Sequence, residues 1–454
     1  MWMYELRSDL GWNNSAWGGF GLYTKFQIVD YNFELNRYVW YHHYQGIYRC
    51  NQFLARVPAI IFSDTKFKDQ YLSEVKFLRA LYYYDLVNLY GTPPLILEPS
   101  TGAEMPSNST PALIWAQVER DLTEAIPNLP AEYKPVDSLN GPGRITKGAA
   151  HSLLGKVYMQ QHKYQEASLQ FKQVIESGKY ELVPEFVDNF RLENENNKES
   201  IFEIQFSDVS MGDWPDYNSP NAPMGNKWSQ YIAPRDVGGH SDGQPGVWYV
   251  NQFSDKTLDG KPDPRAEWSV YFKMTQRMFG KLFIGFGGYT PLDTTGGKWP
   301  KVWYAKYSNG YCNKTEDFNS PINLRLIRYA DILLLQAEAL NELNGPTTEV
   351  YALIDQVRQR PSVNIKPLSQ QNPGINKEQM KGQIEHEHIV ELGGEGLRWQ
   401  DLARYGYLDS ETGRATLISH DKEFLTYRTP YCKYLPIPLC DLDLNPNLKQ
   451  NEGW

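Results

Sequence analysis

The sequence predicts a mainly α-helical protein with one large loop-rich insertion that carries short strands. Three observations lead to this prediction: a helical-hairpin motif, helical spacing of apolar residues along much of the chain, and one long stretch rich in glycine, proline and tryptophan. The chain has 454 residues, of which 14% are aromatic. We expect much of that aromatic surface to do more than fill a core.

The helical hairpin is predicted at residues 146–179. Five residues there match the L-G-x2-Y…A-x3-F spacing of a tetratricopeptide repeat, namely Leu154, Gly155, Tyr158, Ala167 and Phe171. Gly155 and Ala167 are small enough to let two antiparallel helices approach closely. Because one hairpin cannot bury its own apolar faces, other hairpins must stack on it.

Before this hairpin, residues 1–36 are predicted to be an aromatic loop region, since they are rich in Gly, Asn, Trp and Tyr and show no helical period. Residues 37–183 are predicted to be a helical core. Besides the hairpin, this core is expected to contain a helix over about 37–61, a helix capped by Ser63 or Asp64 and ended by Gly91, and a helix over about 111–126, capped by Ser109 or Thr110.

Residues 184–322 are predicted to be the loop-rich insertion. Residues 201–206, IFEIQF, alternate as a strand does, and residues 210–310 contain 14 Gly, 9 Pro and 6 of the 13 Trp. A long irregular stretch in a compact protein is either functional or disordered. Disordered segments are poor in aromatic residues, so we expect this stretch to be ordered and functional.

After the insertion, residues 323–406 are predicted to return to the helical core. Leu324 to Gly345 is expected to be one helix covered on both sides, and residues 346–360 give it a partner, which makes a second hairpin. Another helical region is expected over about 376–405, interrupted at Gly393–Gly394. Residues 407–454 are predicted to be an extended tail, because their end holds too much Pro and Asn for a helix.

Composition and spacing exclude several classes of protein. A net charge of −9 argues against a nucleic-acid partner, which favours a basic surface. No apolar run is long enough to span a membrane, and no cofactor motif is present. The run from His386 to Glu391 is not H-E-x-x-H, so no metal site is predicted. Glu391, Glu395, Arg398 and Asp401, one turn apart, indicate a structural ion-pair network or a solvated face rather than a catalytic carboxylate pair.

Five stretches together resemble the SusD/RagB family of outer-membrane glycan-binding lipoproteins. They are R-x-x-R-Y-A-D-I-L-L-L-x-A-E-A-x-N (Arg325 to Asn341), FLRALYYYDLVNLYG (Phe77 to Gly91), Asp263–Pro264–Arg265, E-x-x-x-E-L-x-x-E-G-x-R-W-x-D-L-x-R-x-G (Glu387 to Gly406) and the L-P-I-P…D-L-N-P-N-L-x-Q-N tail. They occur in the family's order over nearly the whole chain. His388 differs, since the family usually has Arg there.

The resemblance implies a right-handed superhelical scaffold of tetratricopeptide hairpins and no catalysis. It implies a glycan ligand, a TonB-dependent, SusC-like transporter as partner, and a position at the cell surface on the outer membrane. The family's lipoprotein cysteine and first segment are not in this sequence, so we expect a truncated chain whose lipid anchor is missing. The insertion over 184–322 is then the expected glycan-binding part.

The candidate ligand residues are amphipathic rings with amide neighbours. A pyranose stacks its C–H face on such a ring, while its hydroxyls require polar partners. The predicted residues are Trp299, Trp303, Trp12, Trp17, Asn13, Asn14, Tyr289 and Trp228. Trp299 is the favoured platform, with Trp12 or Trp17 as a second wall, whereas Trp303 lies in what reads as a strand packed on the body. For each residue the alternative is that it packs loops onto the helices.

The predicted function is non-catalytic binding of an oligo- or polysaccharide and its delivery to the transporter. A glycoside hydrolase is one alternative, but it requires two carboxyl groups about 5–9.5 Å apart, and no acid in the aromatic loops has an obvious partner. A pure protein-interaction scaffold is the other, although the aromatic insertion exceeds what a scaffold needs.

Overall fold

The structure is a computed structural model, which describes residues 2–13, 18–133, 141–207, 225–233, 235, 238–271, 277–278, 281–282, 302–312 and 320–454. Its elements are mainly helices, with short two-stranded pairings. The chain forms two compact units. Unit 1 contains Met1–Thr24 and Tyr180–Asp401, and unit 2 contains Lys25–Lys179 and Leu402–Trp454.

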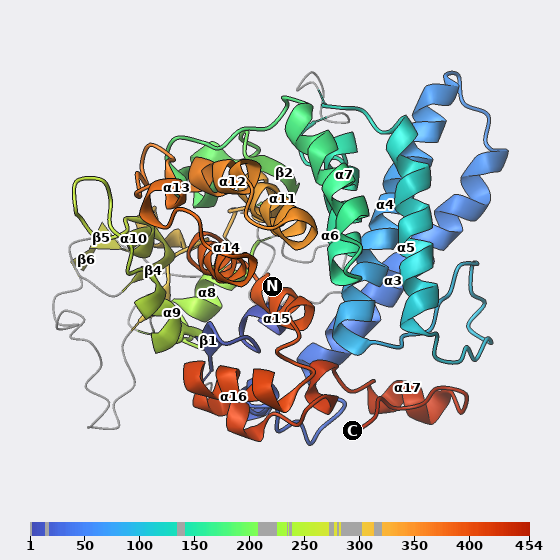
Figure 1. The fold of residues 1–454 in the computed structure, drawn as a ribbon. Helices are drawn as coiled ribbons and strands as arrows, with labels where there is room; N and C mark the ends of the chain where they lie inside the picture. The colour runs from blue at the N-terminus through green and yellow to red at the C-terminus, as the bar shows by residue number, and fades with distance from the viewer. Residues whose placement is uncertain are drawn as a thin grey trace. The chain divides into compact units, whose positions relative to one another are not determined.

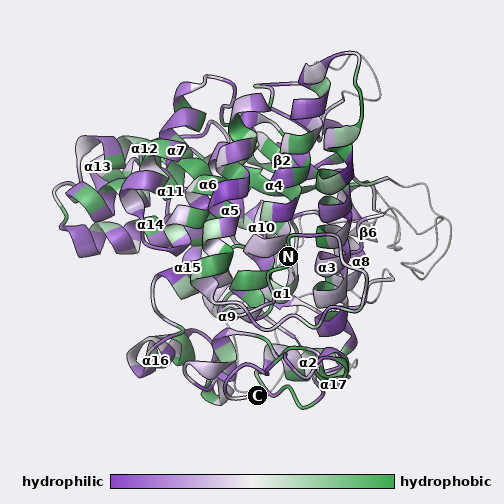
Figure 2. Cartoon of the chain, turned by 90° about the vertical axis from the view of Figure 1, so that its right-hand side faces the viewer, coloured by the Kyte–Doolittle hydropathy of each residue, from purple (hydrophilic) through white to green (hydrophobic). Residues whose placement is uncertain are grey.

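Unit 2 is helical throughout its core. Its helices are α3 (Glu34–Arg56), α4 (Thr65–Tyr90), α5 (Pro111–Ala125), α6 (Lys147–Gln160), α7 (Tyr164–Glu176), α16 (Glu411–His420) and α17 (Leu439–Leu444). Helices α3 to α7 lie side by side, each packed on its neighbour in sequence or on α4 (Figure 1). Hydrophobic and hydrophilic residues alternate along α5 (Figure 2), as expected for a helix that buries one face.

The predicted hairpin in unit 2 is confirmed as α6 and α7. The side chain of Thr146 caps α6 by accepting from the Ala149 N–H at 3.2 Å. Ala167 and Phe171 are fully buried, and a Cβ on Gly155 would overlap the ring of Phe171. The hairpin therefore closes around a glycine, as the repeat spacing predicts.

The other helices predicted in unit 2 are also confirmed, and their ends follow local signals. The carboxylate of Asp64 caps α4 by accepting from the Lys66 N–H at 2.9 Å, and Gly91 ends it with a positive φ of 71°. Thr110 caps α5. The prediction for the C-terminal residues is wrong in part, because 411–420 and 439–444 are helical.

Unit 1 combines helices with short strand pairs. Its helices are α1 (Trp2–Glu5), α2 (Gly18–Thr24), α8 (Trp228–Ile232), α9 (Val247–Gln252), α10 (Arg265–Ser269), α11 (Tyr329–Asn344), α12 (Thr348–Arg358), α13 (Leu368–Gln371) and α14 (Lys377–Leu392); α15 (Arg398–Arg404) begins at its last residues. Its strands are β1 (Gly11–Trp12), β2 (Ser200–Ile204), β3 (Gln244–Pro245), β4 (Val270–Tyr271), β5 (Arg277–Met278), β6 (Lys281–Leu282), β7 (Trp303–Tyr304) and β8 (Leu324–Arg328). All four pairings are antiparallel: β1 with β3, β2 with β8, β4 with β7 and β5 with β6.

Helix α11 is the centre of unit 1 and packs on both α12 and α14. The second predicted hairpin, α11 and α12, is confirmed, as is the later helical region with its break near Gly393–Gly394. The single helix predicted from Leu324 to Gly345 is wrong over its first five residues. These form β8, because Leu324 to Arg328 pair with β2 instead of continuing the helix.

Two further local predictions in unit 1 need correction. Within the predicted aromatic loop region 1–36, the composition of Gly11 to Tyr23 predicts a loop, but this stretch contains β1 and much of α2. The sequence Asp263–Pro264–Arg265 predicts a turn entering a strand, but the motif leads first into the helical turn α10. The Asp263 carboxylate accepts from the Arg265 backbone N–H at 2.9 Å, which favours the helical start.

A buried ion-pair network holds β2, β8, α12 and α14 together. Glu199 accepts from Arg328 and Arg360, each at 2.5 Å. Glu391 pairs with the same two arginines, at 3.2 Å and 2.7 Å. Glu395 pairs with Arg328 at 2.8 Å. Glu391 and Glu395 therefore belong to a structural ion-pair network, as predicted, but they pair with Arg328 and Arg360, whereas Arg398 pairs with Asp9 at 2.8 Å.

The same network explains the Asp-Pro-Arg motif. The Arg265 guanidinium is fully buried and binds Asp263 at 2.8 Å, Glu387 at 2.5 Å and Glu391 at 3.3 Å. A buried guanidinium without such partners would be very costly. The motif thus serves the interior of unit 1, not a ligand.

Candidate functional site

Four predicted ligand residues lie in the described part of unit 1, and all four are buried. Trp12 and Trp303 are 6% and 8% exposed, Trp228 is 1% exposed, and Asn13 is fully buried. This burial fits the packing role that the sequence analysis kept open for each of them. Contact with a ligand stays a prediction for these residues.

Trp228 forms an aromatic cluster with Tyr249 and Tyr304. The ring centroids of Trp228 and Tyr304 are 6.0 Å apart, and those of Tyr249 and Tyr304 are 6.3 Å apart. The Trp303 indole N–H donates to the Ser241 hydroxyl at 3.1 Å. Trp303 and Tyr304 form strand β7, so the expectation of a strand packed on the body is confirmed.

The remaining predicted residues, Asn14, Trp17, Tyr289 and Trp299, lie outside the described residues. The structure does describe the strands at which their segments begin and end. Residues 14–17 follow β1, whose Trp12 pairs with Gln244 of β3. The Gln244 side-chain amide donates to the carbonyl of Val302, directly after residues 283–301, at 3.0 Å. The two predicted aromatic segments are therefore attached to unit 1 at neighbouring points.

Beneath this cluster lies an acid that the sequence analysis missed. Glu5 is fully buried and accepts from the Tyr304 hydroxyl at 3.1 Å and from the N–H groups of Gly394 and Gly396 at 3.0 Å and 2.9 Å. Burial raises its pKa, while these donors oppose the rise. A solitary glutamate in an N-terminal segment gives no sequence signal for such a role.

Three acids of the ion-pair network, Glu199, Glu387 and Glu395, have a pKa that is lowered instead. Burial opposes ionisation of Glu199, but the Arg360 and Arg328 guanidiniums outweigh it and lower the pKa of Glu199 to about 2. Burial is likewise outweighed at Glu387 and Glu395, where arginines lower the pKa. These carboxylates stay ionised at neutral pH, so they cannot act as general acids.

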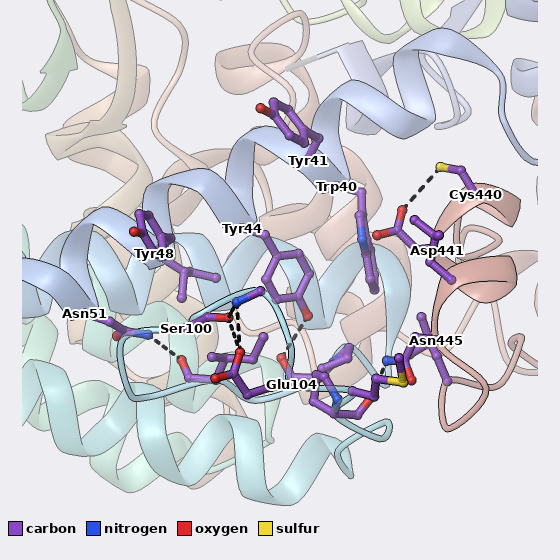
Figure 3. Close-up of a pocket in the computed structure, with 18 of the residues that line it drawn as sticks. Trp40, Tyr41, Tyr44, Tyr48, Asn51, Ser100, Glu104, Cys440, Asp441 and Asn445 are labelled. Atoms are coloured by element: carbon purple, nitrogen blue, oxygen red, sulfur yellow. Dashed lines mark hydrogen bonds between the residues drawn. The ribbon is translucent and has the colours of Figure 1, made fainter.

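A separate cavity of about 710 Å³ lies within unit 2. We call it the α3 pocket, because six aromatic or apolar side chains of α3 line it: Tyr38, Trp40, Tyr41, Tyr44, Ile47 and Tyr48. Its other walls are residues 94–106 and the segment from Cys440 to Leu448. Figure 3 shows Trp40 and Tyr44 pointing from α3 toward residues 94–106.

Hydrogen bonds fix the walls of the α3 pocket (Figure 3). The Tyr44 hydroxyl donates to the Pro94 carbonyl at 2.8 Å, and the Asn51 amide donates to the Ile96 carbonyl at 2.9 Å. The Asn445 amide donates to the Pro106 carbonyl at 2.8 Å. The carboxylate of Glu104 accepts from its own loop, including the Ser100 hydroxyl at 2.7 Å.

The α3 pocket is not among the sites predicted from the sequence. Tyr44, Ile47, Tyr48 and Asn51 lie about one turn apart, a spacing that by itself indicates only a helix. The available signal was the number of tyrosines on one helical face, since a buried core usually prefers aliphatic residues at such positions. The carboxylates that complete the lining come from distant parts of the sequence.

Searches for other kinds of site gave two results. Within the described ranges, no group of three or more His, Cys, Asp and Glu side chains could hold a metal ion. Among those same residues, no helix is both long and apolar enough to cross a membrane.

Comparison with protein families gave two matches. A family model described as "SusD family" matches residues 198–454. A second model, described as "Starch-binding associating with outer membrane", matches residues 8–159.

Individual proteins match over most of the chain. A SusD-like protein of Formosa agariphila is 27% identical over 430 residues, which cover 91% of this chain and 78% of that protein. A crystal structure of a SusD superfamily protein from Bacteroides vulgatus has a TM-score of 0.81 at 28% identity and covers 100% of this chain and 93% of that one. A structure named "Laminarin binding SusD-like protein" has a TM-score of 0.75 at 25% identity, with coverage of 100% and 94%.

Proposed function

The chain belongs to the SusD family, and from that premise we propose that it binds a glycan at the cell surface without cleaving it and delivers it to a TonB-dependent, SusC-like transporter. A lipid anchor holds it at the outer membrane in this proposal, which the outer-membrane description of the second family model supports. That the ligand is a glycan is supported by the family and by the similar structure named for laminarin binding.

One observation carries the placement of the ligand. Strand β1 leads into residues 14–17, residues 283–301 lead into β7, and the Gln244 side chain bonded to Val302 joins these points through β3. Trp17 and Trp299 are therefore attached to neighbouring strands of unit 1. We propose that Trp299 is the stacking platform and that Trp17 is the second wall, with Asn14 and Tyr289 supplying polar contacts.

The buried aromatic cluster includes Tyr304 of β7, the strand that follows residues 283–301. Tyr304 is tied to Glu5 and to the Leu10 carbonyl, at 3.1 Å and 3.2 Å. Rigid support limits the ordering entropy that binding costs. In this proposal the buried Trp12, Trp228 and Trp303 help to position the segments.

The proposal that the protein does not cleave its ligand is supported by the buried carboxyl groups, which already have hydrogen-bond or ion-pair partners within the protein. A glycosidase requires one acid with a raised pKa and a second carboxylate, both facing the sugar. Glu5 has a raised pKa, but it is fully buried and its oxygens accept from three donors. The carboxylates of the ion-pair network are committed to arginines.

Affinity electrophoresis against a panel of polysaccharides, beginning with laminarin, tests this function. The parent protein should be retarded by at least one neutral polysaccharide. Trp299→Ala should weaken that binding by about 1–3 kcal/mol, judged from bases stacked on aromatic rings, which is roughly 5- to 150-fold. The melting temperature should not change.

The matched control is Trp115→Ala, which removes a half-buried tryptophan of α5 in unit 2. Retardation of this control should equal that of the parent. If Trp299→Ala binds as the parent does, or loses binding only because it unfolds, the platform lies elsewhere. A parent that no polysaccharide retards contradicts the function itself.

A further inference from the structure

We infer that the α3 pocket is a second carbohydrate site, separate from the aromatic segments of unit 1, and that it takes an uncharged stretch of glycan. The inference rests on the proposed function, because it assumes that the protein meets glycans. It goes beyond that function because it assigns a different site, in unit 2, and because it specifies that the ligand is uncharged.

The first argument is the chemistry of the exposed rings. Tyr41 and Tyr48 lie seven residues apart on α3, which places them on the same helical face. They line the pocket and are 49% and 45% exposed. Half-exposed tyrosines offer a flat apolar face together with a hydroxyl, and that combination suits the apolar face and hydroxyl rim of a sugar.

The second argument is that the pocket is already formed. The bonds from Tyr44, Asn51 and Asn445 to backbone carbonyls tie α3, residues 94–106 and the C-terminal segment into one frame. Its volume of about 710 Å³ falls within the ~300–1,000 Å³ of ordinary small-molecule sites. A preformed site avoids the entropy cost of ordering its own walls.

The third argument is charge, and it selects the ligand class. The ionisable groups of opposite sign that line the pocket are one guanidinium, Arg37, and three carboxyl groups, Glu98, Glu104 and Asp441. Hydrogen bonds from Ser100 and Thr101 lower the pKa of Glu104 to about 2, so it is anionic at neutral pH. Carboxylates repel uronates and sulfated sugars, whereas an uncharged sugar meets no such repulsion. The pocket therefore suits a neutral glycan.

The first test uses two neutral hexasaccharides, laminarihexaose and maltohexaose, and one anionic polymer, polygalacturonate. The variant Tyr41→Ala/Tyr48→Ala removes both exposed rings, and its dissociation constants are compared with those of the parent by titration calorimetry. We expect the affinity of the variant for at least one neutral hexasaccharide to be at least tenfold lower than that of the parent. Any affinity for polygalacturonate should not change. Tyr48→Phe keeps the ring and should retain most of the affinity.

Phe67→Ala is the matched control, since Phe67 is an exposed aromatic of unit 2 (44%) that does not line the pocket. It should bind as the parent does. Unchanged neutral binding in the double tyrosine variant overturns the inference, and so does an effect confined to polygalacturonate. If Trp299→Ala alone abolishes binding, the proposed function stands and this inference falls. If the parent binds no neutral sugar of the panel, both fall.

A second test reports on the pocket without a mutation. Cys440 lines the pocket, whereas Cys312 is an exposed cysteine of unit 1. Maleimide labelling, read by peptide mass spectrometry, should slow at least fivefold at Cys440 when the neutral hexasaccharide saturates the protein. Labelling at Cys312 should not change. Equal rates at Cys440 with and without the sugar overturn the inference, as does equal slowing at both cysteines.

Discussion

At the scale of single residues, most charged residues of the family motifs are buried and form ion pairs inside the protein. The acids and arginines of the family motifs are interior groups: Arg265, Arg328 and Glu391 are all buried, and both arginines pair with Glu391. The sequence analysis could predict a network from the turn spacing of its acids. It could not predict the partners, because Glu199 and Arg360 lie 161 residues apart.

Glu199→Gln tests that network. The change leaves Arg328 and Arg360 facing a neutral amide, so the free energy of unfolding at pH 7 should fall by about 3–5 kcal/mol. Because the folded pKa of Glu199 is lowered to about 2, its contribution is present above about pH 4.5 and is lost as the pH falls toward 2. Acidification should therefore cost the parent more stability than the variant.

Denaturant melts between pH 7 and pH 3 measure this difference. The control is Glu176→Gln, which removes an exposed partner of Lys172 at 3.5 Å. Exposed pairs contribute about 0–1 kcal/mol, so the control should melt almost as the parent does. Equal losses in the two variants would mean that the network does not stabilise unit 1.

Glu423 in unit 2 should show the opposite pH dependence. Burial and the nearby charge of Asp421 raise its pKa to about 8, although Lys25 lies 3.7 Å away. A raised carboxyl pKa gives stability that is present below about pH 4.5 and lost as the pH rises through 8. Glu423→Gln should match the parent near pH 4.5 and exceed it at pH 8. Melts in which the two curves stay parallel over this range would refute the shift.

At the scale of elements, local sequence signals predict the helices well, but they do not predict the pairing of strands that are far apart in the sequence. Caps such as Asp64 and Thr110, and the stop at Gly91, are read from neighbouring residues. Leu324 to Arg328 was assigned to a helix because apolar residues occur on almost every face of that stretch. Its identity as β8 depends on β2, more than a hundred residues earlier, and one sequence does not show such pairing.

Gly155→Leu tests the packing of the α6–α7 hairpin. A side chain there meets the ring of Phe171, so overpacking should lower the free energy of unfolding by about 1–3 kcal/mol. The control is Gly382→Leu in α14, where no atom lies within 4 Å of an added Cβ. Leucine is the better helix former, so that control should gain roughly 0.5 kcal/mol. Changes of the same sign in the two variants would show that the hairpin register is misassigned.

At the scale of the whole molecule, the chain alternates between two units instead of running through successive segments. The first 24 residues belong with residues 180–401, as the buried pair of Asp9 and Arg398 at 2.8 Å illustrates. The linear segments predicted from composition could not show this, because they grouped residues by neighbourhood in sequence. Composition did indicate the aromatic insertion, and the strands at its ends are where the structure anchors it.

The central claim is that this molecule retains a glycan and leaves it intact. The direct measurement is one sample of purified protein, titrated with a polysaccharide that retards it and assayed in parallel for new reducing ends. We predict saturable binding with a dissociation constant between micromolar and millimolar, about 4–8 kcal/mol, and no release of reducing ends over days. Steady release in proportion to protein concentration, undiminished by further purification, would contradict the account.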